Sequence, residues 1–117
     1  MKKLAFISII IFFITSCTTQ KPLYSWSKYE TTSYNFLKNS NEKSTQELIE
    51  TYQSIIEKQK GTRKVVPPGI YADYGFILLQ ANKTDEGKAL LLKEVQLYPE
   101  SKIFIDRILK MIEKWKK

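Results

Sequence analysis

The sequence has no histidine and a single cysteine, Cys17, among its 117 residues. With no second cysteine, the chain cannot form an intramolecular disulfide. Histidine is the commonest metal ligand and a frequent general base, and ordinary zinc sites need histidine or several cysteines. We therefore expect no metal, no cofactor and no small-molecule substrate, and we expect the protein not to be an enzyme.

Arginine is also scarce, because only Arg63 and Arg107 carry a guanidinium group among 19 basic residues. The planar guanidinium fork is the preferred partner of phosphates and base edges, so we expect no nucleic-acid partner. The 12 acidic residues leave a net charge of +7, of which Lys2 and Lys3 contribute two. We interpret the surplus lysine as a source of solubility and of attraction to anionic lipid headgroups.

The apolar stretch at the amino terminus is too short to span a bilayer. It covers the eleven residues 4–14, whereas a membrane-spanning helix needs about twenty. Lys2 and Lys3 precede it, and the polar segment 15–20 follows it. Such a pattern is typical of a cleaved secretory signal, and we predict a signal peptide over residues 1–16.

The end of this segment, Ile14-Thr15-Ser16-Cys17, resembles the lipobox of bacterial lipoproteins. There the thiol accepts a diacylglyceryl group as a thioether, and small residues let the signal peptidase cut between Ser16 and Cys17. Two or three acyl chains attach a protein stably to a bilayer. The alternatives are an ordinary signal peptide with an incidental cysteine, or an uncleaved anchor. The next residue, Thr18, is not aspartate, which favours the outer membrane and its periplasmic face.

The mature chain is predicted to be a short tether followed by one helical domain. Residues 17–23 are polar and contain Pro22, which indicates a lipidated tether. Apolar residues then recur with helical spacing over residues 24–117, and we expect an all-α fold of antiparallel hairpins. The five predicted helices cover about 25–38, 44–60, 68–81, 84–98 and 101–117, with Ser44, Thr84 and Ser101 as amino-terminal caps and Ser44–Glu47 as a capping box.

Residues 68–101 match the tetratricopeptide repeat, a helical hairpin with a period of about 34 residues. Gly75 and Gly87 are the small residues that let the two helices approach closely, and Pro99 ends the hairpin. Since an isolated repeat cannot bury both faces, we expect the 26–61 hairpin and the last helix to cover it. A generic helical hairpin is the alternative. The matching positions are Tyr71, Tyr74, Gly75, Leu78, Gly87, Leu91 and Pro99.

Candidate partner contacts follow from the same repeat. The first helix of each pair lines the groove in such repeats, which predicts contacts at Ala72, Phe76, Leu79 and Gln80. Exposure of Phe76 and Leu79 would indicate a binding surface.

The roles of one acidic residue and of a set of aromatic residues leave alternatives open. Glu94 is either an exposed glutamate or the partner of a basic residue on the next helix, such as Arg107. Large aromatic residues near the tether are interpreted first as core, with a partner-binding patch or a belt near the headgroups as alternatives. These residues are Tyr24, Trp26, Tyr29 and Tyr34.

Three segments carry a family resemblance: Leu23-Tyr24-x-Trp26-x-x-Tyr29-Glu30, Pro67-Pro68-Gly69-x-x-Ala72-x-x-Gly75, and Glu94 followed by Tyr98-Pro99-Glu100-Ser101. In order and spacing they resemble a family of small bacterial lipoproteins of unknown function. The resemblance implies gene neighbours that encode a curli-secretion-type lipoprotein and a second small lipoprotein, and hence a shared envelope assembly. It implies no catalytic residue, because no activity is established for that family.

We therefore expect a non-enzymatic interaction module on the outer membrane, with other envelope lipoproteins as its partners. A pilotin-like chaperone for a secretin or channel subunit is the alternative. An envelope enzyme acting on peptidoglycan is the third possibility, and it would depend on Glu94 or Glu100 without an evident acid–base pair.

Overall fold

The computed structural model describes residues 1–4 and 18–115, and within these ranges the chain is helical and contains no strand. The predicted all-α class with antiparallel hairpins is confirmed. Most of the predicted signal peptide, together with Ser16 and Cys17, lies outside the described residues. No helix within those ranges combines the length and the apolar character needed to cross a membrane. The elements are α2 (Tyr29–Lys38), α3 (Glu42–Glu57), α4 (Ile70–Gln80), α5 (Thr84–Leu97), the 3-10 turn η1 (Pro99–Ser101) and α6 (Lys102–Trp115).

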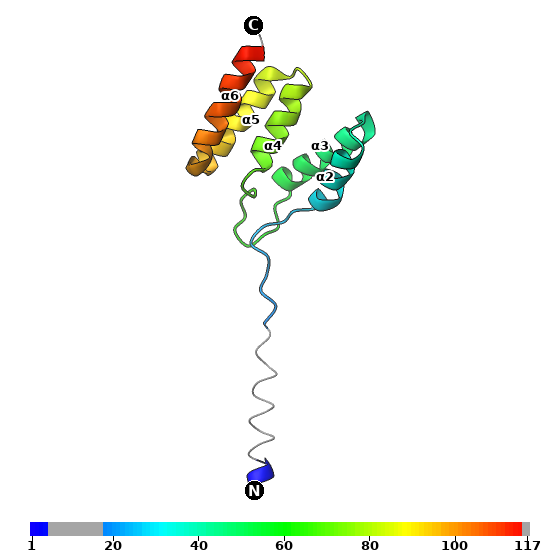
Figure 1. Ribbon diagram of the computed structural model, residues 1–117. Helices are drawn as coiled ribbons and strands as arrows, with labels where there is room; N and C mark the ends of the chain where they lie inside the picture. The colour runs from blue at the N-terminus through cyan, green and yellow to red at the C-terminus, as the bar shows by residue number, and fades with distance from the viewer. Residues whose placement is uncertain (5–17, 116–117) are drawn as a thin grey trace.

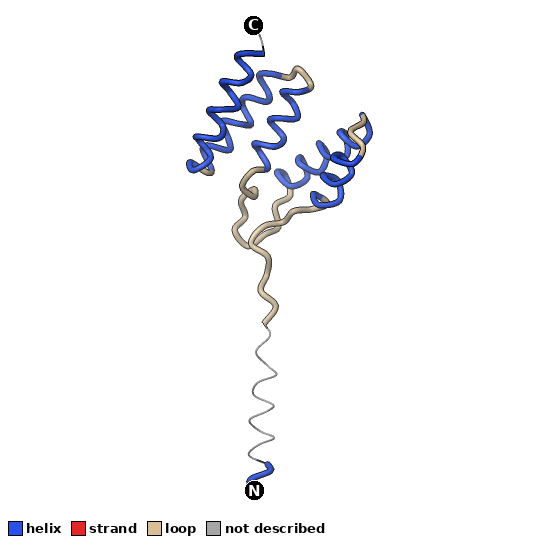
Figure 2. Tube along the Cα trace, viewed as in Figure 1, coloured by secondary structure: helices blue, strands red, loops and turns tan. Residues whose placement is uncertain are grey.

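The helices form two hairpins and a final helix (Figure 1). Helices α2 and α3 make the first hairpin, α4 and α5 make the second, and α6 packs against the second. Figure 2 shows that an extended amino-terminal segment and the long connection between α3 and α4 meet at one end of the domain. There the amides of Thr62 and Arg63 donate to the carbonyls of Pro22 and Leu23, at 3.1 Å each.

Helix α4 is central because it contributes to both apolar cores. Asp73 is the only charged residue in its sequence, IYADYGFILLQ, since a helix that packs on both sides has little room for solvated groups. The first core joins α3 and α4 through Leu48, Tyr52, Ile55, Val66, Ile70, Tyr71 and Ile77. The second joins α4, α5 and α6 through Ala72, Leu79, Leu91, Ile105, Ile108 and Ile112.

The predicted glycine contact between α4 and α5 is confirmed. A Cβ atom added at Gly75 would lie 2.8 Å from the carbonyl oxygen of Gly87, and one added at Gly87 would lie 2.7 Å from that of Gly75. Real Cβ atoms do not approach a carbonyl oxygen so closely. Glycine at both positions is therefore what allows the two backbones to touch.

The predicted capping residues differ from what the structure shows. Helix α3 begins one turn earlier than expected, with Asn41 as its cap: the Ser44 amide donates to Asn41 Oδ1 at 2.9 Å and the Asn41 amide donates to Ser44 Oγ at 3.0 Å. Asparagine is as good a cap as serine, so the box closes at the earlier site. Thr84 is the first residue of α5 and makes no cap, and Ser101 ends the turn η1, which runs directly into α6.

The segment before α2 is not helical and contains a turn at Ser27 and Lys28, so this helix begins at Tyr29 rather than at Ser25. The side chain of Gln59 binds both the amide and the carbonyl of Ser25, which occupies backbone groups that a first helical turn would use. Gly61 is not the end of α3, which closes at Glu57. A Cβ atom at Gly61 would collide with the backbone of residues 23–24, so this glycine permits the crossing of the two segments.

Candidate functional site

Helices α2, α4 and α6 border two adjoining hollows, which we call the α2–α4–α6 groove. A cavity of about 210 Å³ lies between α2, α3 and α4, and one of about 260 Å³ lies between α4 and α6. Asp73 and Phe76 line both cavities, so the two meet over α4. The first cavity is also lined by Tyr29, Ser33, Phe36, Leu37, Leu48, Tyr52 and Ile77, and the second by Ala72, Phe104, Ile108 and Met111.

The rims of the groove carry large apolar side chains in contact with solvent. Phe104 is 59% exposed on α6, and Leu37 is 81% exposed at the end of α2. Phe104, Ile108 and Met111 follow one another at a spacing of four and three residues, so they form a stripe along the groove side of α6. Single exposed apolar residues are common on proteins, but apolar side chains gathered around a concavity indicate a binding surface.

Asp73 is the one acidic residue that lines the two cavities of the groove. It lies on the first turn of α4 and accepts a hydrogen bond from the Tyr29 hydroxyl of α2 to its Oδ2 atom, at 2.9 Å. The side chain remains accessible to solvent. The carboxylate therefore bridges two walls of the groove and remains accessible from within it.

The surroundings of Asp73 change the acidity of both partners. Partial burial raises the pKa of the Asp73 carboxyl, and the hydrogen bond from Tyr29 opposes this rise by stabilising the ionised form. Burial, followed by the hydrogen bond to Asp73 and the negative charge there, raises the pKa of Tyr29 to about 12. Tyr29 consequently stays protonated at physiological pH and remains a hydrogen-bond donor to the carboxylate.

A row of aromatic rings holds Tyr29 in place. Its ring lies 5.7 Å from that of Trp26 and 5.9 Å from that of Tyr52, which stacks on Tyr74 at 5.5 Å. Such spacing is typical of favourable aromatic pairs. Of the four aromatic residues near the tether, Tyr29 is partly buried and packs against the first core, Tyr24 is partly buried, and Trp26 is 43% exposed. Tyr34 is 62% exposed, so its interpretation as core is wrong.

The four predicted partner contacts separate into two groups. Ala72 and Phe76 line the groove. Leu79 does not, because it is only 7% exposed and packs in the second core, so it lacks the exposure that would indicate a binding surface at this position. Gln80 is exposed at the end of α4 and lines neither cavity. Asp73 was missed, although it stands three residues before Phe76 and seven before Gln80, which is the spacing of one helix face.

Glu94 is neither exposed nor paired with Arg107 in the described structure, so both expectations are wrong. It is 1% exposed, and its Oε1 atom accepts the amide of Gly69 at 2.7 Å. Gly69 has a φ of +92° at the start of α4, a conformation that only glycine adopts readily. The Tyr98 hydroxyl donates to the Val66 carbonyl nearby, at 2.6 Å. Glu94 and Tyr98 thus attach the turn before α4 to the end of α5.

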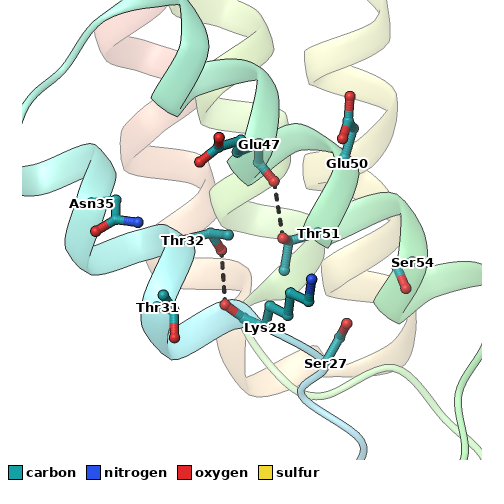
Figure 3. Close-up of a pocket in the computed structure, with 9 residues that line it drawn as sticks. All are labelled: Ser27, Lys28, Thr31, Thr32, Asn35, Glu47, Glu50, Thr51 and Ser54. Atoms are coloured by element: carbon teal, nitrogen blue, oxygen red, sulfur yellow. Dashed lines mark hydrogen bonds between the residues drawn. The ribbon is translucent and has the colours of Figure 1, made fainter.

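A separate hollow, of about 480 Å³, lies between α2 and α3 and is lined by polar residues. Figure 3 shows its side chains and the hydrogen bonds of two of them: Thr32 donates to the Lys28 carbonyl at 3.0 Å and Thr51 to the Glu47 carbonyl at 2.9 Å. These hydroxyls serve their own backbone segments and are not directed to a ligand. The α2–α4–α6 groove is therefore the stronger candidate site. Among the described residues, no group of three or more acidic, histidine or cysteine side chains could hold a metal ion.

Comparison with known proteins places the chain in a family. Residues 23–108 match the model of a domain of unknown function, DUF4810, a range that holds all three segments on which the family resemblance rests. No curated protein and no solved structure matches the chain. Since the matched range covers most of the sequence, the chain belongs to the DUF4810 family.

Proposed function

We propose that this protein is a lipid-anchored, non-enzymatic interaction module of the bacterial outer membrane, and that the α2–α4–α6 groove binds a segment of another envelope protein. The observation that carries the proposal is the groove itself, where two apolar hollows meet at a single carboxylate. A concave apolar surface with one well-placed polar group is typical of a binding site.

The chemistry of the groove defines the segment it would take. The Asp73 carboxylate at the junction favours a lysine or arginine, because a charge-assisted hydrogen bond is strongest where water is partly excluded. The hollows on either side favour large apolar side chains next to that cation. Phe76 lines both hollows and separates them, so it sets the distance between the two apolar anchors.

The anchor supplies the second half of the proposal. Lipidation at Cys17 would confine the domain to the membrane surface, which raises its effective concentration toward other membrane-held proteins. A groove of this size could then form stable complexes even with modest intrinsic affinity. We propose envelope lipoproteins as partners on the ground of the family resemblance and this shared confinement.

Copurification after crosslinking in intact cells tests the groove. We expect Asp73→Arg and the double variant F104A/M111A each to reduce strongly the amount of partner lipoprotein recovered from membranes. The matched control is L92A/L97A, which removes two exposed apolar side chains of α5 (53% and 44% exposed) that lie outside the groove. Equal recovery with the groove variants and the control would contradict the proposal. A channel subunit as the recovered chain would favour the pilotin-like role.

A further inference from the structure

The positive charge of the mature chain is concentrated at the end of the domain from which the tether leaves. Residues 18–28 and 58–64 contain six basic and no acidic residues. The remaining segments, 29–57 and 65–117, contain eleven basic and twelve acidic residues, so they contribute almost no net charge. The six cations are Lys21, Lys28, Lys58, Lys60, Arg63 and Lys64, which we call the basic end.

The fold brings these two segments together although they are far apart in the sequence. The amides of Thr62 and Arg63 bind the carbonyls of residues 22 and 23, and Gln59 binds the backbone of Ser25. Arg63 also donates to the Tyr24 hydroxyl at 2.9 Å and lies 5.6 Å from the centre of that ring. All six cationic residues are exposed. The charge is therefore displayed on an ordered surface and not along a loose tail.

Two apolar side chains lie exposed within the same surface. Leu23 is 58% exposed, and Trp26 is 43% exposed although one side of its ring packs near Tyr29. Tryptophan is favoured at the boundary between headgroups and acyl chains. Cations beside an exposed tryptophan and leucine form a surface that suits the interface of an anionic bilayer.

We propose that the basic end docks directly on anionic phospholipid headgroups, with Leu23 and Trp26 inserted at the interface. This inference rests on the proposed lipid anchor, because five backbone steps from Cys17 to Pro22 span at most about 17 Å. Electrostatic attraction decays over about 10 Å at an ionic strength of about 0.1 M, and a tether this short would let the cations come that close to the headgroups. Docking would fix the orientation of the domain, with the end of α6 directed away from the membrane (Figure 1).

Trp26 itself provides the test. The sequence has two tryptophans, so the substitution Trp115→Phe leaves Trp26 as the only tryptophan of the mature, lipidated protein, and excitation at wavelengths that tyrosine does not absorb isolates its fluorescence. This protein is reconstituted on vesicles of phosphatidylethanolamine, with or without phosphatidylglycerol, that carry brominated acyl chains. We expect Trp26 fluorescence to be quenched on the vesicles with phosphatidylglycerol, and the quenching to fall several-fold at high salt.

Charge reversal then separates docking from tethering. K21E/K60E/K64E should lose most of the quenching while the protein stays on the vesicles. K83E/K110E/K114E has the same net charge but changes the α4–α5 connection and the second half of α6, and it should keep the quenching. Figure 1 shows that this connection and the end of α6 lie away from the tether. Circular dichroism checks that both variants remain helical.

Each other result overturns the inference. Docking is contradicted, but the lipid anchor is not, if the protein stays on the vesicles without quenching. The same holds if the quenching does not depend on phosphatidylglycerol or is unchanged in K21E/K60E/K64E. Protein that leaves every vesicle contradicts the lipid anchor on which docking rests. Neither result bears on the groove, whose partner contacts are measured by the copurification test.

Discussion

The two hairpins of this domain are held together in different ways. In the α4–α5 hairpin, Gly75 and Gly87 bring the backbones into contact. In the α2–α3 hairpin, side chains fill the space between the helices, with Tyr29 and Tyr52 at 5.9 Å. Backbone contact tolerates no added atom, whereas packed side chains can rearrange. We therefore expect the α4–α5 hairpin, which we call the rigid frame, to tolerate less change than α2, the other wall of the groove.

The largest effect should come from breaking the glycine contact. Gly87→Val would drive a branched side chain into the Gly75 carbonyl and Leu79, both 2.7 Å from the added Cβ atom. We expect a loss of about 3 kcal/mol or more in the free energy of unfolding, measured by chemical denaturation. Ala89→Val, at an exposed site on the same helix, is the control for valine in a helix and should cost less than about 1 kcal/mol.

A change in the α2–α3 hairpin that keeps the size of the side chain provides the comparison with the α4–α5 hairpin. Thr51 is 6% exposed on α3 and donates only to the Glu47 carbonyl of its own helix. Thr51→Val keeps the shape of the side chain, so we expect a loss of about 1 kcal/mol or less. A cost as large as that of Gly87→Val would show that both hairpins are equally intolerant.

The next largest effect should come from Glu94, which attaches the rigid frame to the turn before α4. Glu94→Ala removes the acceptor of the Gly69 amide and leaves a cavity, and we expect it to cost about 2 kcal/mol. Glu94→Gln retains an acceptor oxygen and should cost clearly less. Denaturation of the two variants side by side checks this order, and an equal loss would mean that the bond to Gly69 contributes nothing.

Tyr98→Phe should have a smaller effect at the same junction. It removes the 2.6 Å hydrogen bond to the Val66 carbonyl and leaves the ring in place, so the expected cost is about 1 kcal/mol. The thermal midpoint should fall accordingly. An unchanged midpoint would indicate that water replaces the hydroxyl and that Glu94 alone secures the turn.

The smallest effect on stability should come from Asp73, and it should depend on pH. The folded state raises the pKa of this carboxyl above its ordinary value of 3.8, so the folded protein keeps the proton longer than the unfolded chain. The contribution of this proton to the free energy of unfolding is fully present below the ordinary pKa and is lost as the pH rises through the pKa of the folded state. Because Asp73 is accessible to solvent, the change is a few tenths of a kcal/mol.

Asp73→Asn has no carboxyl to titrate and should abolish this part of the pH dependence. The difference between its unfolding free energy and that of the parent protein should shift in favour of the variant as the pH rises from about 3 to about 7. Denaturation curves across that range measure the difference. If this difference instead shifts in favour of the variant as the pH falls, the hydrogen bond from Tyr29 dominates and the folded state favours the ionised carboxyl.

Local patterns in the sequence predicted the elements but not the contacts between distant segments. Helical spacing located the five helices α2 to α6, and the repeat template identified Gly75 and Gly87 as a pair because their separation is a property of one hairpin. Contacts across 25 to 39 residues had no such template, as with Gly69 and Glu94 or Tyr24 and Arg63. Glu94 illustrates the reason, since only the fold shows that its charged group meets a backbone amide.

The candidate site was predicted in part for the same reason. The repeat template selected α4 as a groove helix and so found Ala72 and Phe76. It did not show that α2 would bring Tyr29 to Asp73, nor that α6 would turn Phe104 and Met111 toward the groove, because these depend on how three helices pack. Leu79 was misplaced because helical spacing alone does not distinguish a groove position from the neighbouring core position.

A photocrosslinking scan along α6 in intact cells tests the groove most directly. A photoreactive amino acid is placed in turn at Ile103, Phe104, Lys110 and Met111, of which only Phe104 and Met111 line the groove. The account predicts partner adducts at these two positions, absent from their neighbours one residue away and lost when Asp73→Arg is added. Adducts of equal yield at all four positions, or confined to Ile103 and Lys110, would contradict it.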